Sequence, residues 1–583
     1  MASQEPPYVA VAQRKQAELA AAIPAEWRLP AHDIPGGMLS ISDSITVGPK
    51  HYQRVGVMDI PRTCGILTPK ELEITEKYDV RGLVAEMTEG RLKAQDVVRG
   101  FCKRAAIAHQ LTRCLTEPLF GRALQRAQEL DDHLQRTGVP IGPLHGLPVS
   151  VKDTFNIKGV DSSIGLSALA FKPAESNAPL VDLLQSLGAV VITKTNIPQT
   201  LGTLDSCNHL FGRTLNPLNR QWTAGGSTGG EGALIAMRGS MVGFGTDIGG
   251  SIRIPAMCQG IYGFKPSTGR VPYGGQQSGQ IEGKGRMGLQ AVAGPLARSV
   301  ADINAVMAEI VPCAELFGAD CIPGSWPSQS VPVTLAPRNF TIGILKTDGL
   351  VTPLPPITRI LNEVANKLRR TPGVEVIDIP VPSVLSKCQA LAGRLMGIDD
   401  GSHMLDLIES MGEELIPWLQ DRMKRGKALT VVQLAKLQAQ RAEIEEEMMK
   451  MWKLTSQDSS VTRRVDAIIC PVAPHPVPEL DRYNAVGYTS SFVLLDYPAS
   501  SVPIRSFTES DLEIDREMDA PVLGSWDKAN RQLWDEKTVD RRVYLGSPLS
   551  VQVVTPKQHD YQLFQAMEIV DRAVHGRGST AKL

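Results

Sequence analysis

A stretch of 51 residues, from Gly225 to Gly275, holds fifteen of the 52 glycines in this chain of 583 residues. Two serines lie in glycine turns within it, Ser227 in GGSTGG and Ser251 in TDIGGSIR. Glycine at this density lets backbone N–H groups converge on a small anion, as a nucleophile beside an oxyanion hole requires. Plain turns are the simpler alternative. Because Phe244 and other apolar residues are interleaved with the glycines, we expect a folded core, and the first hypothesis is a serine hydrolase.

Composition excludes several other classes of function. An apolar fraction of 42% is enough to bury a large core with a deep pocket. Lysine and arginine total 61 against 62 aspartate and glutamate residues, so bulk charge indicates neither a nucleic acid nor a membrane partner. The cysteines number nine, and the close pair Cys313 and Cys321 lacks metal-site spacing. We therefore expect reduced thiols and no metal site.

The two ends of the sequence indicate where the protein is expected to be located. The N-terminal MASQEPPYVAVAQRKQAEL reaches charged residues before any apolar stretch of signal-peptide length, and no uncharged apolar run of 18 residues follows. We expect a protein that is neither secreted by that route nor membrane-spanning. The final Ala581, Lys582 and Leu583 are similar to the Ser-Lys-Leu peroxisomal address, which would bind the import receptor. The expected location is cytoplasmic or peroxisomal, with a merely frayed tail as the alternative.

Hydrophobic patterning predicts an alternation of helices and strands. Helical spacing of apolar residues recurs over 97–108, 123–134 and 360–368, and a shorter helix is expected near 183–187. Strands are expected at LPVSVKDT, AVVITK, FTIGILK, VEVIDI and VDAIICP, which favours a largely parallel or mixed sheet. In the first of these strands, Lys152 should stand at the strand's end and face away from the packed side. Residues 404–452 are rich in helix formers and predict one or two long helices.

We divide the chain into three parts. Residues 1–75, with a helix near 14–22 and a Pro- and Gly-rich connection, should wrap around the core. Residues 76–575 contain no repeat and no low-complexity tract, so we expect one large α/β unit there. Residues 576–583 should form a flexible C-terminal tail.

The two serine turns differ in what precedes them. GGSTG satisfies the nucleophile-elbow pattern at Ser227, but that elbow needs a buried strand before it, and LNRQWTA does not read as one. MVGFGTD does predict a short strand, and the turn with Ser251 follows it directly. The backbone N–H groups of Ile248, Gly249, Gly250 and Ser251 can curl into a nest that would stabilise a tetrahedral oxyanion.

The chain resembles the amidase signature family, and the core of the resemblance lies at about residues 143–302. The motifs that carry the resemblance occur in the family's order: PLHGLPVSVKDTFNIKG, KTNIPQT, GRTLNP, AGGSTGGEGAL, GTDIGGSIRIPA, YGFKPSTGR and GPLARSVAD. GGEGAL, FCKRAAIAHQLT, IPAEW and GYTSSFVLLDY look most like the fungal acetamidase-like branch. The resemblance implies a single large α/β domain at 76–575, with a twisted mixed β-sheet flanked by helices.

The resemblance also implies a Ser-Ser-Lys triad. Ser251 matches the family's nucleophile, Ser227 the bridging serine held by a cis peptide, and Lys152 the base. Lysine acts as a base only when neutral, and burial beside hydroxyl groups favours that form. Supporting positions are Thr228, whose hydroxyl should lie near the triad, and Asp247 and Arg253, which should brace the loop.

By this resemblance the chain should hydrolyse a small or medium carboxamide to a carboxylate and ammonia or an amine, through an acyl-enzyme and without metal or cofactor. Alternatives in the same family are a fatty-acid amide hydrolase, an amidase of a biosynthetic pathway, and the subunit that makes glutaminyl-tRNA. A catalytically silent scaffold is disfavoured, because Lys152, Ser227 and Ser251 are all present. The resemblance permits a homodimer, and the substrate-binding residues cannot be assigned from the sequence.

Overall fold

The computed structural model describes residues 6–327, 339–455, 462–482, 486–514, 518 and 520–576. The C-terminal Ala581, Lys582 and Leu583, with their predicted peroxisomal address, lie outside the described residues. Among the helices that are described, none has the length and apolar character needed to cross a membrane.

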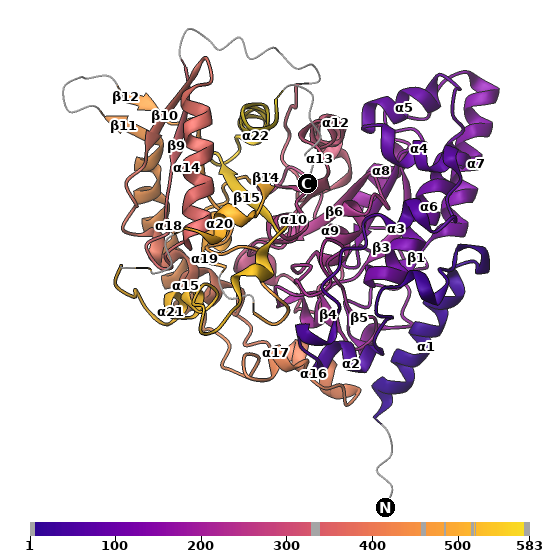
Figure 1. Ribbon diagram of the computed structural model, residues 1–583, viewed down its shortest axis with the longest axis horizontal. Coiled ribbons are helices and arrows are strands. Elements are labelled where there is room, and N and C mark those ends of the chain that lie inside the picture. Colours follow the sequence, from indigo (N-terminus) through magenta and orange to yellow (C-terminus); the bar gives the residue numbers. More distant parts are fainter. Residues whose placement is uncertain are drawn as a thin grey trace, which may run out of the picture.

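One sheet of eleven strands runs through the molecule and links its two halves (Figure 1). In spatial order its strands are β1 (Leu115–Pro118), β3 (Val190–Thr195), β2 (Pro148–Lys152), β6 (Val242–Asp247), β8 (Val292–Ala297), β7 (Tyr262–Lys265), β14 (Ala499–Ser506), β15 (Pro548–Val554), β13 (Ala467–Pro471), β9 (Phe340–Ile344) and β10 (Val374–Asp378). Short pairs are formed by β4 (Cys207–Asn208) with β5 (Gly212–Arg213), and by β11 (Lys453–Thr455) with β12 (Thr462–Arg464).

The sheet is mixed, which confirms the predicted fold class. β2 pairs in parallel with both β3 and β6, and β9 pairs in parallel with β10 and β13. The strands between these groups are antiparallel to their neighbours. Lys152 is the last residue of β2, as predicted. All five residues of β2 are buried, so the prediction that Lys152 faces away from the packed side was wrong. Both faces of this strand are covered, as is usual for parallel neighbours.

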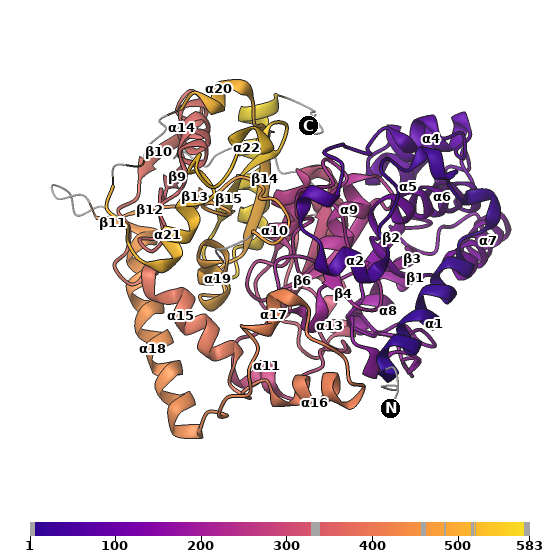
Figure 2. The same ribbon diagram turned by 60° about the horizontal axis from the view of Figure 1, so that its bottom comes forward.

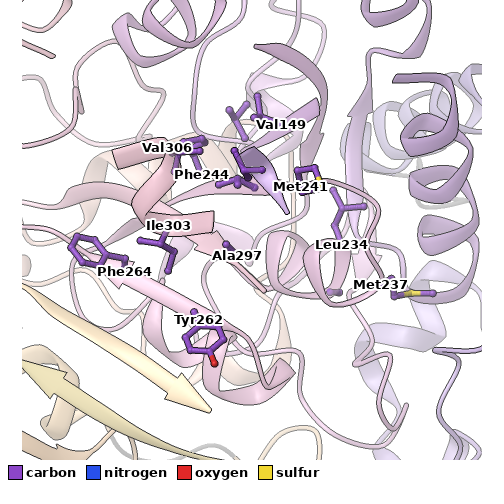
Figure 3. Packing of buried hydrophobic residues seen from close by; sticks show 14 of the residues in the cluster. Val149, Leu234, Met237, Met241, Phe244, Tyr262, Phe264, Ala297, Ile303 and Val306 are labelled. Carbon is purple, nitrogen blue, oxygen red and sulfur yellow. The ribbon is translucent and has the colours of Figure 1, made fainter. Parts of the chain in front are cut away.

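Helices pack on the sheet and on one another around a continuous apolar core. The principal ones are α6 (Ala94–Thr112), α7 (Phe120–Thr137), α8 (Pro179–Ser186), α9 (Gly229–Ala236), α10 (Arg253–Gln259), α12 (Val300–Ile310), α14 (Pro355–Arg369), α19 (Gly487–Leu494) and α22 (Asp560–His575). Figure 3 shows side chains from β2, β6, β8, α9 and α12 meeting at the centre, among them Val149, Phe244, Ala297, Leu234 and Ile303. This core holds β2 and β6, which carry the candidate site.

The N-terminal segment lies against the first strands of the sheet. Its helices include α1 (Pro7–Ala22), α2 (Ile41–Thr46), α4 (Pro69–Lys77) and α5 (Val80–Thr88). Lys15 of α1 is 4% exposed, and its Nζ lies 2.6 Å from Glu117 Oε1 and 2.8 Å from Asp161 Oδ2. A buried ammonium between two carboxylates ties α1 to β1 and to the chain that follows β2.

Residues 402–449 form three helices where one or two long ones were predicted. α16 (Ser402–Ser410) and the short α17 (Pro417–Gln420) come before α18 (Val431–Met449). Proline at the start of α17 and glycines at 412 and 426 interrupt the helical pattern. Figure 2 shows α18 lying beside α15 (Leu385–Met396) at the edge of the molecule, and the two helices are in contact.

Candidate active site

Lys152 is fully buried at the carboxyl end of β2. Its Nζ lies 2.7 Å from Ser227 Oγ and 2.9 Å from Thr246 Oγ1. Ser227 is 75 residues away in the sequence, and Thr246 lies near the end of the neighbouring strand β6. The structure therefore joins two of the three predicted triad members by a direct hydrogen bond.

Burial changes the acid–base character of this lysine. It lowers the pKa of Lys152 from 10.5 to about 7, against opposing effects of the Asp247 and Glu231 carboxyl groups, which raise it. The cause is desolvation, because an ammonium group loses its hydration in a closed interior. A substantial fraction of neutral amine is then available near neutral pH, as a general base requires.

Ser227 lies in the turn before α9 and is 3% exposed. The peptide bond between Gly226 and Ser227 is cis, as the resemblance implied. Ser206 fixes both sides of this turn, since its hydroxyl donates to the Gly225 carbonyl and accepts the Gly229 N–H, each at 3.0 Å. The Ser227 hydroxyl is thus carried by a turn with a defined backbone, and in the described chain no strand runs directly into Ser227.

Ser251 lies in the loop between β6 and α10 and is 8% exposed. Asp247, the last residue of β6, organises this loop: its Oδ1 accepts the Gly250 N–H at 2.8 Å and its Oδ2 accepts the Ile252 N–H at 3.2 Å. Arg253 donates to both carboxylate oxygens, at 3.0 and 2.9 Å. The predicted bracing by Asp247 and Arg253 is present in these contacts.

The backbone donors of the loop are not all equivalent. The Gly250 N–H, which we expected to face an oxyanion, instead donates to Asp247. The reason is geometric: at the glycine-specific φ of 132° the loop turns this N–H inward. Within the described residues, no hydrogen bond engages the N–H groups of Ile248, Gly249 or Ser251. Three of the four predicted donors therefore stay available.

Other predicted contacts are weaker. Thr228 is buried, and its hydroxyl lies 3.4 Å from the Thr246 carbonyl, at the edge of hydrogen-bond distance. The described residues contain no hydrogen bond between the Ser251 hydroxyl and Ser227; Ser227 lies in the turn before α9, and Ser251 lies in the loop after β6. The structure thus links Lys152 to Ser227 directly, and the predicted contact between Ser227 and Ser251 stays a prediction.

Three supporting residues were not predicted. Gln552 on β15 accepts from Arg253 at 2.6 Å and donates to the Tyr488 carbonyl, which ties the loop to the distant half of the sheet. The Thr489 hydroxyl donates to the Gly249 carbonyl at 2.6 Å. Thr246 meets Lys152, as described above. Gln552 lies in the segment 546–554 and Thr489 in the motif GYTSSFVLLDY, but the local sequence does not reveal that these side chains reach residues 240 or more places earlier.

A family model described as Amidase matches residues 96–564, which is most of the chain. The chain belongs to the amidase family. An acetamidase of Aspergillus oryzae is 33% identical over 570 residues, covering 96% of this chain and 98% of that protein. An acetamidase of Emericella nidulans is 33% identical over 553 residues, covering 93% and 94%. These matches confirm the predicted resemblance and show that this amidase is an amide hydrolase.

Solved structures agree with the sequence matches. A structure of fatty acid amide hydrolase is similar to this amidase with a TM-score of 0.83 and 27% identity, covering 98% of this chain and 96% of that one. The predicted single α/β domain with a large mixed sheet is therefore confirmed by both the strand order and a structural neighbour.

Proposed function

We propose that this amide hydrolase works through an acyl-enzyme on Ser251, with Ser227 and Lys152 as its proton relay. The observation that carries the proposal is the 2.7 Å hydrogen bond between the buried Lys152 amine and the Ser227 hydroxyl. Ser251 stands on the neighbouring loop, whose conformation Asp247 fixes. A serine hydroxyl needs a base to become a nucleophile, and this arrangement offers one.

Acylation begins when Ser251 Oγ attacks the carbonyl carbon of the amide. The hydroxyl proton passes to Ser227, whose own proton passes to Lys152, so the lysine becomes an ammonium group. The N–H groups of Ile248, Gly249 and Ser251 are the donors we assign to the resulting oxyanion. When the carbon–nitrogen bond breaks, the relay runs in reverse and the proton goes to the leaving nitrogen, because an amide anion is a very poor leaving group.

Deacylation repeats the relay with water. A water molecule attacks the ester carbon, and its proton reaches Lys152 through Ser227. The bond between the acyl carbon and Ser251 Oγ then breaks, and the proton returns to the serine. The products are a carboxylate and ammonia or an amine, and every proton that the lysine takes up it gives back.

The substrate we propose is a small or medium carboxamide. The two acetamidases that are similar over almost their whole length support this choice. The likeness to fatty acid amide hydrolase, which covers nearly all of both chains, supports a long-chain amide as the second candidate. The same panel of substrates distinguishes the two.

The test measures ammonia release from acetamide, benzamide, indoleacetamide and a long-chain primary amide. We expect turnover of at least one of the first three, and loss of turnover in Ser251→Ala. Ser240→Ala is the matched control, since Ser240 lies in the same glycine-rich stretch and donates to the Pro148 and Val242 carbonyls outside the site. Added hydroxylamine should divert the acyl group to a hydroxamate, as an acyl-enzyme allows.

Two results would count against the proposal. If Ser251→Ala keeps wild-type turnover, the nucleophile is another residue. If the long-chain amide alone is hydrolysed, the substrate class proposed here is wrong and the second candidate replaces it.

A further inference from the structure

The peptide unit between Gly249 and Gly250 is held at both of its polar atoms. Its carbonyl oxygen accepts a hydrogen bond from the Thr489 hydroxyl at 2.6 Å, and its N–H donates to Asp247 Oδ1 at 2.8 Å. Because a peptide unit is planar, two such bonds fix its orientation. The peptide units on either side carry the N–H groups of Gly249 and Ser251, which we assign to the oxyanion. A rotation of the middle unit would therefore redirect both donors.

The two glycines of this unit have different surroundings. Gly250 is buried, and a Cβ at this position would collide with the Thr489 side chain. Gly249 is partly exposed, and a Cβ there would have no atom within 4 Å. The loop is thus packed against α19 at Gly250 and has open space beside Gly249. A substrate carbonyl group can approach the backbone donors through this space.

A second route connects the same loop to α19. Gln552 on β15 donates to the Tyr488 carbonyl at 2.9 Å and accepts from Arg253 at 2.6 Å. Arg253 in turn donates to both oxygens of the Asp247 carboxylate. The hydrogen bonds therefore close a ring, which runs through Thr489, Gly249, Gly250, Asp247, Arg253, Gln552 and Tyr488. A buried polar network whose members all have partners is rigid, so the ring should hold the loop in one conformation.

The Thr489 hydroxyl also has an acceptor in its own helix. Its Oγ1 lies 3.1 Å from the Val486 carbonyl, and threonine in a helix often donates to a carbonyl three or four residues earlier. A hydroxyl has only one proton to donate, and the Gly249 carbonyl is closer, at 2.6 Å. The hydrogen bond is therefore directed to the loop, where it joins residues 240 places apart.

We propose that Thr489 is a positioning residue for the oxyanion hole: its hydroxyl holds the Gly249–Gly250 peptide unit so that the N–H groups of Gly249 and Ser251 point at the oxyanion. This inference rests on the proposed function, in which these groups stabilise the tetrahedral intermediate. Thr489 itself takes up no proton and forms no covalent bond. The proton still passes from Ser251 through Ser227 to Lys152.

Thr489→Val separates the hydroxyl from the shape of the side chain. Valine has nearly the same size but cannot donate to the Gly249 carbonyl. Once the peptide unit is released on this side, its neighbours point less accurately at the oxyanion, so the transition state is less stable. The hydrogen bond between Lys152 and Ser227 does not involve Thr489, so the pH dependence should not change. Thr489→Ser keeps the hydroxyl and should regain most of the rate.

The experiment follows the labelling of Ser251 by a fluorophosphonate between pH 5 and 9, detected by mass spectrometry. Ser251 Oγ bonds to phosphorus, fluoride leaves and the serine proton passes to the relay, while the phosphoryl oxygen occupies the place of the oxyanion. Both the rate constant and the final labelled fraction are measured. For Thr489→Val we expect the rate constant to fall about 10- to 100-fold, with the acid limb and the final labelled fraction as in the wild type.

Thr112→Val is the matched control. Thr112 is also fully buried, and its hydroxyl donates to the Ala108 carbonyl at 2.7 Å within α6. This variant should label at the wild-type rate. Thr489→Ala is a second test variant, which also removes the hydroxyl and serves if Thr489→Val does not fold. Its labelling should be slowed to a similar extent.

The outcomes separate this inference from the proposed function. If Ser251 of the wild type is not labelled, the proposed function fails and this inference fails with it. If the wild type is labelled and Thr489→Val has the same rate constant, the inference alone is overturned. A loss confined to the final labelled fraction would show that Thr489 only supports folding. A shifted acid limb would show that it acts on the base, and slow labelling of Thr489→Ser would show that the hydroxyl is not the group that matters; each result overturns the inference.

Discussion

At the scale of single residues, Lys152 sets the pH dependence that we expect of amide hydrolysis. The neutral amine is the base, and its pKa in the folded protein is about 7. We therefore expect kcat/KM to rise as the pH increases through about 7 and then to level off. Lys152→Ala should lower kcat/KM by about 10²- to 10⁴-fold, as measured by steady-state kinetics from pH 5 to 9.

Lys265 provides the control for this prediction. It is also fully buried, on β7, where burial lowers its pKa to about 8 and its amine donates to the Pro266 carbonyl. Lys265→Met should keep the acid limb at the wild-type position. If the limb moves with Lys265→Met and stays in place in residual Lys152→Ala activity, the base has been assigned to the wrong lysine.

At the scale of elements, two ion pairs of the buried Lys15 help to hold α1 against the rest of the molecule. Lys15→Met would remove the buried amine that now lies 2.6 Å from the partly exposed Glu117 carboxyl and 2.8 Å from the buried Asp161 carboxyl. Breaking a buried pair in this way costs about 3–5 kcal/mol, so we expect the free energy of unfolding in urea to fall by that order. Lys77→Met breaks an exposed pair with Glu73 and should cost less than about 1 kcal/mol. Equal losses in the two variants would show that α1 is not held by Lys15.

The helices and strands show which elements the local sequence pattern predicts correctly and which it does not. Short apolar segments, alternating in β2 and continuous in β3 and β13, correctly predicted these strands and also β9 and β10. For residues 404–452 one or two long helices were predicted, whereas the structure has three helices there. The prediction was based on helix propensity alone, which does not show where proline and glycine divide a helical region.

At the scale of the whole molecule, the core joins both halves of the chain. The largest apolar cluster runs from Ala12 on α1 to Val570 on α22, and one sheet crosses it. We therefore expect a single main transition in calorimetry, with the calorimetric enthalpy close to the van't Hoff value. Two resolved transitions would mean that the halves fold separately in spite of their shared sheet.

The sequence by itself determined the local parts of the site. Glycines after Asp247 indicated a sharp turn with free backbone donors, and the missing strand before Ser227 separated the two serines. The order of the motifs indicated the family, which the comparisons confirmed. These inferences succeed because turn chemistry and strand patterning depend on residues that are close together in the chain.

Only the tertiary structure decided how the parts act on one another. Strand order places β2 beside β6, so Lys152 lies 2.9 Å from Thr246, and the turn before α9 places Ser227 2.7 Å from the same amine. It also brings Gln552 and Thr489 against the loop that carries Ser251. A pKa depends on how much water surrounds a group and which charges face it, and residues far apart in the sequence provide both. Local patterning contains neither quantity, so the sequence could name a lysine but could not show that burial makes it a base.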